Sequence, residues 1–302
     1  MLGGVVFCQN SGARLRRTAL SIDLGRIIDL DRYPIDRTET RAYGAMLDRV
    51  RCDLARDGCA VLAGFVRASA IATLVTEAER VSPFAHRSFN RTNAYFTEDD
   101  ESLPCGHPVR RFYERSNAFV PADNFGPDSS LRAVYEWEPF APFVRTVLEE
   151  EHFYRYADPL ADVIINVVES GGGFPWHFDT NNYTITLAIQ NGDEGGLFEY
   201  VPNLRTPEFE NYDGVRAVLD GKRDNVRSLA LKPGDLQIFK GRYSLHRVTP
   251  VRGYRSRYVG IFSFADVPDM IARVARTRQL YGRILPIRLE REAETRRDAL
   301  KD

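Results

Sequence analysis

Apolar side chains in the first part of the chain recur at the three- and four-residue spacing of an amphipathic helix. Across residues 38–56 they are Tyr43, Leu47, Val50 and Leu54. Side chains at this spacing share one face of a helix. We therefore expect a helix that packs this face against a core and leaves the intervening charged residues in solvent.

The next predicted elements follow closely. Asp57 and Gly58 form turns readily and end this helix, and the apolar run 59–65 predicts a short buried strand. A second amphipathic helix is expected around residues 71–78, and a third over 131–150. The first thirty residues show no firm period and predict an arm or an edge element.

Between these helices, residues 82–130 are rich in Asn, Pro, Asp and aromatic residues and have weak periodicity. Long loops inside a compact protein usually carry function. We expect ordered loops rather than a linker, because large aromatic side chains need burial. These aromatic residues are Phe89, Tyr95, Phe96, Phe112, Tyr113 and Phe119.

From Asp158 onward the pattern changes to short β-rich runs separated by turn signals. The runs are 162–168, 183–190, 197–201, 226–231, 236–239 and 257–264. The turn signals are the glycines of 171–173 and 195–196, the Pro-Gly pair at 233–234, and Gly253. Many short strands with regular turns predict an antiparallel barrel or jelly roll.

These elements predict a mainly β protein with flanking helices and a jelly-roll, cupin-like core. We expect one domain over residues 1–302. N-terminal helices and substrate loops would occupy 1–157, the β core 158–266, and a C-terminal helical segment 267–302. The last segment is expected to be helical because Ile271, Val274 and Leu280 follow helical spacing.

Composition and charge argue against several classes of protein. The 302 residues include 41 basic and 42 acidic side chains, so no overall field attracts nucleic acid or an anionic membrane. No window is apolar over the length of a membrane span, and the apolar patch 5–7 precedes its arginines, the reverse of a secretory signal. Four cysteines without a CxxC pair indicate reduced thiols, with Cys59 buried. A cytoplasmic protein is expected.

The C-terminal stretch 273–297 is rich in arginine, but Glu290, Glu292 and Glu294 are interleaved. Such a mixture is typical of a solvated helix face rather than of a nucleic-acid site. We expect a small-molecule substrate and no nucleic-acid or membrane partner, and a homodimer is left open.

His177 and Asp179 are the first candidates for chemistry. On an extended segment, side chains two residues apart project to the same side, so both can reach one point. His246 is the only histidine further along the chain, and a turn and a strand are expected to bring it back across the sheet. Two imidazoles and one carboxylate form the ligand set of non-haem iron(II) oxygenases, with three metal positions left open. An isolated His-x-Asp is weak evidence, so the surrounding residues decide its weight.

Arg255 and Arg257 open the last predicted strand. A guanidinium offers a carboxylate a rigid bidentate fork, which a lysine ammonium does not. An arginine is therefore expected to hold the far carboxylate of a 2-oxoglutarate co-substrate. The two arginines share a face of a regular strand, so spacing does not choose between them.

The order His-x-Asp, Pro-Gly-Asp, His and Gly-x-Arg resembles the iron(II)/2-oxoglutarate oxygenases of double-stranded β-helix fold. Further stretches resemble, more narrowly, the halogenases and hydroxylases that act on free amino acids such as lysine. These stretches are 95–100, Arg115-Ser116, 157–159, 176–179, 195–200 and 239–246. The resemblance implies iron(II), 2-oxoglutarate and O2 as cofactors, with His177, Asp179 and His246 as the catalytic metal ligands.

Asp179 separates two activities within that group. Members that halogenate have a small residue, usually Gly or Ala, at this position, which leaves room for chloride on the metal. Chloride here would have to displace Asp179 and leave a buried charge uncompensated, which is costly. The resemblance therefore implies hydroxylation of a small molecule, a free amino acid or related natural-product intermediate. Desaturation and cyclisation stay open as outcomes.

Four further residues are candidate substrate contacts, each with a purely structural role as the alternative. Arg115 would pair with a substrate carboxylate, and Thr180 would hydrogen-bond a polar group beside the metal ligands. Tyr281 would lie in a segment folded over the mouth of the site, and Trp176 would form a wall.

Two other classes of protein remain to be weighed. A cupin-type metalloprotein of another activity generally uses more histidines than this chain offers. A non-catalytic barrel would be marked by the loss of a ligand, yet all three ligand types are present.

Overall fold

The structure is a computed structural model of the chain, and it describes residues 22–287. The segments 1–21 and 288–302 lie outside the described residues. They contain most of the expected N-terminal arm and the end of the Arg-rich stretch.

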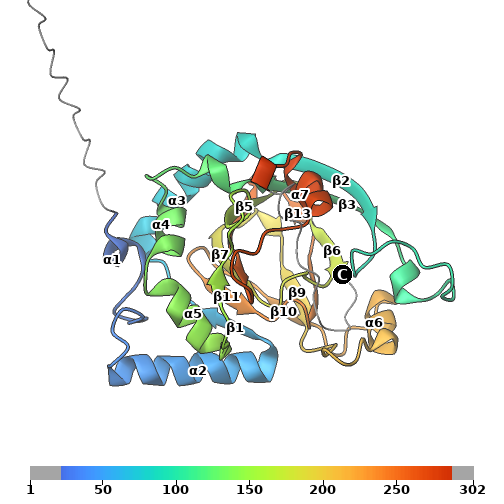
Figure 1. Cartoon of the computed structure of the whole chain (residues 1–302), viewed down its shortest axis with the longest axis horizontal. Coiled ribbons are helices and arrows are strands. Elements are labelled where there is room, and N and C mark those ends of the chain that lie inside the picture. The colour runs from blue at the N-terminus through green and yellow to red at the C-terminus, as the bar shows by residue number, and fades with distance from the viewer. Residues whose placement is uncertain (1–21, 288–302) are drawn as a thin grey trace, which may run out of the picture.

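A 7-stranded antiparallel sheet forms the larger half of the β core (Figure 1). Its strands are, in spatial order, β1 (Cys59–Leu62), β11 (Leu236–Phe239), β7 (Thr184–Gln190), β14 (Arg257–Phe262), β5 (Val163–Val168), β3 (Tyr113–Val120) and β2 (His86–Thr92). Apart from β2 and β3, neighbours in this order are not consecutive strands of the chain, or are joined by long connections, as in a jelly roll.

A smaller sheet faces it. Its strands are, in spatial order, β10 (Arg227–Leu229), β9 (Phe198–Val201), β12 (Leu245–Val248) and β6 (Phe174–His177). Two short ribbons complete the strands: β8 (Glu194–Gly195) with β13 (Val251–Arg252), and β4 (Tyr154–Arg155) with β15 (Phe264–Ala265). The described residues thus form the mainly β core with flanking helices that the sequence predicted.

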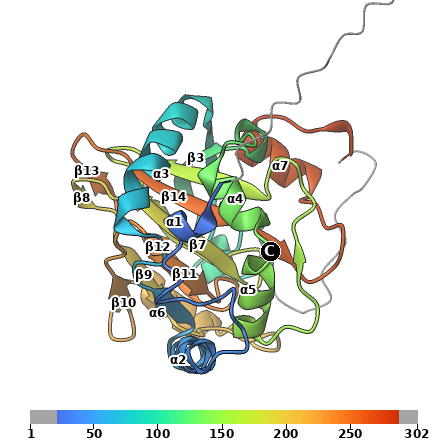
Figure 2. The same cartoon turned by 90° about the vertical axis from the view of Figure 1, so that its left-hand side faces the viewer.

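Helices cover the outer face of the larger sheet (Figures 1 and 2). The covering helices are α1 (Leu24–Ile27), α2 (Arg41–Asp57), α3 (Ala68–Val81), α4 (Ser130–Glu136) and α5 (Phe140–Leu148). The other elements are α6 (Tyr212–Leu219), α7 (Val274–Tyr281), and the 3-10 turns η1 (Ser82–Phe84), η2 (Pro108–Arg110) and η3 (Ala122–Asn124). Within residues 22–287, none of the helices combines the length and apolar composition needed to cross a bilayer.

Strand β5 shows how the core is divided. Val163, Ile165 and Val167 join the cluster packed under the helices, whereas Ile164 and Val168 belong to the cluster between the two sheets. Successive side chains of a strand point to opposite faces, so a strand buried on both sides reads as one continuous apolar run. The space between the sheets is where the candidate site lies.

The expectation of long loops over residues 82–130 is only partly right: residues 93–107 contain no helix or strand. Residues 86–92 and 113–120, however, form β2 and β3, which pair with each other and extend the larger sheet. On β2 the buried side chains are the polar Ser88 and Thr92, whereas Phe89 is 77% exposed although burial was expected for it. The usual alternation of apolar-in and polar-out is reversed here, and so the strand signal was hidden.

The single helix expected over 131–150 is two helices, α4 and α5. The break lies at Trp137, which has extended backbone angles, and Pro139 follows two residues later. Proline cannot donate the backbone hydrogen bond of a helix interior, and it disfavours helical geometry at the residue before it. The helix predicted over 38–56 is α2, which begins after the Thr40 cap and ends at Gly58 with φ 62°.

The larger sheet takes β1, β2 and β3 from the part of the chain before residue 158. The predicted division at residues 158 and 266 therefore does not coincide with the limits of this sheet. That residues 1–302 form a single domain stays a prediction.

Candidate metal centre

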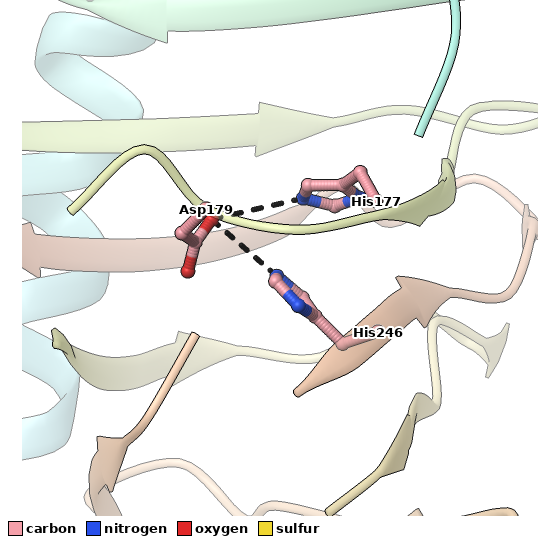
Figure 3. A group of neighbouring side chains, drawn as sticks. All are labelled: His177, Asp179 and His246. Atoms are coloured by element: carbon pink, nitrogen blue, oxygen red, sulfur yellow. Dashed lines mark ion pairs between the residues drawn. The ribbon is translucent and has the colours of Figure 1, made fainter. Parts of the chain in front are cut away.

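Strands β6 and β12 bring His177 and His246 together. The two strands pair antiparallel, with His177 directly opposite His246, and Asp179 follows β6 by two residues. Nε2 of His177 lies 3.8 Å and Nε2 of His246 lies 3.4 Å from Oδ1 of Asp179 (Figure 3). One ligand atom from each residue lies within 4.8 Å of the others. The three side chains converge on one point, as the sequence predicted.

The two imidazoles present the same nitrogen to this point. Nδ1 of His177 lies 2.7 Å from the carbonyl oxygen of Pro175, and Nδ1 of His246 lies 2.9 Å from that of Ser244. A carbonyl oxygen can only accept, so each Nδ1 donates its proton, and in a neutral imidazole Nε2 then carries the lone pair that a metal needs. Burial, followed by the charges of His246 and Arg115, lowers the pKa of His177. A neutral imidazole with a free Nε2 is the form that binds a metal.

The carboxylate of Asp179 is also hydrogen-bonded at Oδ2, the oxygen other than the one nearest the imidazoles. Its Oδ2 accepts a hydrogen bond of 2.5 Å from Oγ1 of Thr184, and its backbone N–H donates to the carbonyl of Gly241. Burial alone would raise the pKa of Asp179, but the two imidazoles and the Thr184 hydroxyl hold it below its ordinary value. The group is therefore an ionised carboxylate.

Gly241 makes this position of Asp179 sterically possible. A Cβ added to Gly241 would lie 1.9 Å from Oδ2 of Asp179 and 2.7 Å from its Cγ. No side chain larger than hydrogen fits beside the carboxylate in this arrangement.

This donor set fits iron(II). Two imidazoles and one carboxylate, gathered on one side of a point, are the facial triad of non-haem iron(II) oxygenases. Each imidazole is oriented by a backbone carbonyl and the carboxylate by a hydroxyl, which is the outer support that bound metals require. Among residues 22–287 this is the one group of three or more such side chains close enough to hold a metal ion.

A cavity of about 220 Å³ adjoins the triad, and Arg257 lines it. Arg257 is the first residue of β14 and is 7% exposed. Burial lowers its pKa to about 10, so the guanidinium is charged at neutral pH. No carboxylate of the described residues lies within ion-pair distance of Arg257, and so its charge faces the cavity uncompensated.

Arg255 does not line the cavity beside the triad. Its Nη2 lies 3.0 Å from Oδ1 of Asp193, and both side chains are largely exposed. The backbone N–H groups of Tyr254 and Arg255 also donate to Asp193, which fixes a surface turn before β14. The strand begins only at Arg257, and therefore the regular alternation assumed for the two arginines does not apply to Arg255.

Three of the four candidate substrate residues line the cavity: Arg115, Thr180 and Tyr281. Arg115 lies on β3 and is 5% exposed. Tyr281 is the last residue of α7 and is also buried. The structure therefore places these three side chains beside the triad, from elements distant in sequence.

Trp176 does not line the cavity. It precedes His177 on β6, so it points to the opposite face of the smaller sheet and packs in a separate cluster with Tyr95 and Phe178. Arg223 and Arg247 lie over its ring at 5.6 and 4.9 Å from the centroid. Trp176, expected as a wall residue, is buried on the outer face of this sheet instead of lining the cavity.

Two residues near the triad were missed from the sequence, Phe96 and Arg276. Phe96 lines an adjoining outer cavity, and its ring lies 5.5 Å from the His177 ring. Arg276, on α7, lines the cavity beside the triad, although the stretch 273–297 was expected to be a solvated face. The signal was present in the helical spacing, because Arg276 shares one side of α7 with Leu280, four residues later.

Comparisons with known proteins agree with this geometry. The family model of halogenase D matches residues 44–280. The crystal structure of AviO1 from Streptomyces viridochromogenes is 18% identical, with a TM-score of 0.50 over 73% of this chain and 95% of that one. A non-haem α-ketoglutarate-dependent carbocyclase of nogalamycin biosynthesis, SnoK, is 11% identical, with a TM-score of 0.50 over 72% and 83% of the two chains.

At such identities the two structures show a shared fold only, and the double-stranded β-helix expected from the sequence is confirmed. No curated protein sequence matches the chain. The family match covers most of the chain and includes all three residues of the triad. The chain therefore belongs to the halogenase D family of iron(II)- and 2-oxoglutarate-dependent enzymes.

Proposed function

We propose that this protein is an iron(II)- and 2-oxoglutarate-dependent hydroxylase that inserts one oxygen atom into a C–H bond of a small molecule. The observation that carries the proposal is the carboxylate of Asp179, whose Oδ1 lies within 3.8 Å of both imidazole Nε2 atoms and whose Oδ2 accepts a hydrogen bond from Thr184. A ferrous ion held there would, together with 2-oxoglutarate and O2 as the oxidant, supply the chemistry needed to break a C–H bond.

The protein's own residues have distinct tasks in this proposal. His177, Asp179 and His246 bind the metal on one side and leave the other side open to the cavity. Arg257 binds the far carboxylate of 2-oxoglutarate through its guanidinium fork. The apolar walls of the cavity, among them Phe174, exclude water from the reacting bond.

Asp179 also favours hydroxylation over halogenation. For chloride to bind the metal, this carboxylate would have to leave a place where Thr184 donates to it and Gly241 packs against it. A displaced carboxylate would be a buried charge without compensation, which costs several kcal/mol. Membership of a family named for halogenation therefore does not by itself assign that activity.

The substrate is proposed to be small because the space beside the triad is limited. An inner cavity of about 220 Å³ adjoins an outer one of about 560 Å³, and both are lined by Tyr156, Thr180 and Asn181. Together they approach the size of typical small-molecule sites. The sequence resemblance favours a free amino acid or a related natural-product intermediate.

The test is a reaction with iron(II), 2-oxoglutarate and O2, followed by mass spectrometry over a panel of amino acids and related metabolites. We expect succinate and CO2, and one product heavier by a single oxygen atom, with no chlorinated product when chloride is added. Asp179→Ala should abolish both succinate and product, whereas Asp213→Ala, a change of an exposed carboxylate on α6, should retain them. Full hydroxylation by Asp179→Ala would refute the ligand assignment.

A further inference from the structure

Building on the proposed function, we infer that the substrate is a small organic anion whose carboxylate or phosphate group is bound by Arg115 and Arg276 beside the metal centre. The inference rests on three observations: the place of Arg276, the contact of both guanidiniums with the ring of Phe96, and the balance of charge along both cavities.

Arg276 borders both cavities. Its Nη1 donates to Oε1 of Gln279 at 3.2 Å, and its guanidinium carbon lies 4.6 Å from the centre of the Phe96 ring. Within residues 22–287, no carboxylate lies within ion-pair distance of Arg276. Buried cations in proteins are normally paired, so a cation that borders a cavity without an acidic partner points to an anionic ligand.

Phe96 links Arg276 to Arg115. The guanidinium carbon of Arg115 lies 4.5 Å from the centre of the same ring, and 5.2 Å from that of Phe174. Aromatic faces attract cations, and therefore this ring stabilises two guanidiniums that would otherwise repel each other.

The backbone of Phe96 is held in an uncommon conformation to place the ring there. Its φ is 60°, in the left-handed region that bulky side chains rarely adopt. The buried amide of Asn93 fixes the turn by accepting from the N–H groups of Tyr95 and Thr97 and donating to the carbonyl of Val109. Backbone strain that the surroundings impose in this way is frequent at ligand sites.

The charges along the two cavities are mostly positive. In the inner cavity, the one carboxylate among the described lining residues is Asp179, and in the outer cavity it is the exposed Glu98. Arg91 and Arg273 also line the outer cavity.

One ferrous ion, one 2-oxoglutarate dianion, Asp179 and Arg257 together carry no net charge. Arg276, which has no acidic partner among the described residues, then adds a positive charge beside the metal centre. Burial, followed by the positive charge of Arg276, lowers the pKa of Arg115 to about 9, which still leaves it protonated at neutral pH. An anion bound between the two would relieve this repulsion.

This arrangement discriminates against basic substrates. A free lysine would bring two ammonium groups into a site whose described residues offer Glu98, at the outer rim, as the one acid besides the metal ligand. The neutral amides of Asn181 and Gln279 can bind polar groups, but they do not discriminate by charge. A carboxylate or phosphate ester without a basic group matches the site better.

The test measures binding to the protein loaded with iron(II) and saturating 2-oxoglutarate, without oxygen, by titration calorimetry. The probes are L-glutamate, L-glutamine and L-lysine, which differ in charge at similar size, and glycerol 3-phosphate with glycerol. We expect an anionic probe to bind roughly 10-fold or more tightly than its neutral counterpart, since hydrogen bonds to charged groups are the stronger ones. The relative affinities of L-glutamate and glycerol 3-phosphate decide between a carboxylate and a phosphate.

Arg276→Gln should reduce this preference by roughly 10-fold and leave the affinity for 2-oxoglutarate unchanged. Arg278→Gln, on the exposed side of the same helix, should alter neither. Arg115→Gln serves as a second variant, and a thermal unfolding curve for each variant shows that the fold is retained.

Three results with the wild-type protein would overturn the inference. They are equal affinity for an anionic probe and its neutral counterpart, no detectable binding of either anion, and a higher affinity for L-lysine than for L-glutamate. An anion preference that survives both substitutions would overturn it as well. The proposed function fails separately, if the wild-type protein with iron(II) and O2 forms no succinate from 2-oxoglutarate.

Discussion

Thr184 donates a hydrogen bond of 2.5 Å to Oδ2 of Asp179, and it thereby turns Oδ1 of the carboxylate toward the two imidazoles. The hydroxyl lies at the first residue of β7, in the larger sheet, whereas the histidines lie in the smaller one. The metal centre is thus assembled across the two sheets.

We expect Thr184→Val to weaken iron(II) binding by roughly 10- to 100-fold, the usual effect of losing an outer partner of a metal ligand. Valine keeps the shape of threonine but removes the hydroxyl, so Asp179 would lose its orientation rather than its space. Metal titration monitored by activity or calorimetry measures the change. Thr146→Val, which removes a hydroxyl from α5, is the control and should keep full affinity. Unchanged iron binding in Thr184→Val would contradict the positioning role.

Substitution of the two arginines near the start of β14 should have very different effects on the KM for 2-oxoglutarate. Arg257→Gln removes the buried guanidinium from the cavity, and we expect the KM for 2-oxoglutarate to rise by roughly 10- to 150-fold, equivalent to about 1.5–3 kcal/mol. Arg255→Gln loses only an exposed ion pair with Asp193 and should leave that KM within about twofold. Initial rates over a range of 2-oxoglutarate concentrations separate the two. A larger effect in Arg255→Gln would reverse the assignment.

Cys59 should be chemically inert in the folded protein. Burial raises the pKa of its thiol to about 12, so below that pH it stays protonated, and the thiolate is the reactive form. At pH 8 its thiolate fraction is on the order of a thousandfold below that of an ordinary cysteine. Iodoacetamide followed by peptide mass spectrometry should therefore find Cys52 and Cys105, both exposed, modified well before Cys59. In denaturant all three should react alike; equal rates in the native protein would disprove the burial.

Two phenylalanines should contribute very differently to stability. Phe140 is fully buried and contacts the rings of Phe65, Phe262 and Phe264, so Phe140→Ala is expected to lower the free energy of unfolding by about 3–5 kcal/mol. Phe89 is 77% exposed on β2, and Phe89→Ala should change it by no more than about 0.5 kcal/mol. Chemical denaturation of the two variants gives both values. A large loss in Phe89→Ala would mean that this face of β2 is covered.

Much of the fold was predictable because the pattern there was local. The helix at 38–56 and six strands of the second half followed from periodicity and turn residues, and these are α2, β5, β7, β9, β10, β11 and β14. Strand β2 could not be found in this way, because its buried side chains, Ser88 and Thr92, are polar, and β3 carries the buried Arg115 at the cavity. Pattern analysis identifies strands that bury apolar residues, and it fails where a strand serves a polar site.

The sequence alone determined the identity of the metal ligands, because a two-residue spacing places His177 and Asp179 on one side of a strand and leaves His246 as the one later histidine. Only the tertiary structure decided between Arg255 and Arg257, took Trp176 away from the cavity, and brought Arg115 and Arg276 to the same aromatic ring. The physical reason is that the direction of a side chain depends on where its strand begins and on which face is covered. Those facts arise from the packing of the two sheets and of α7.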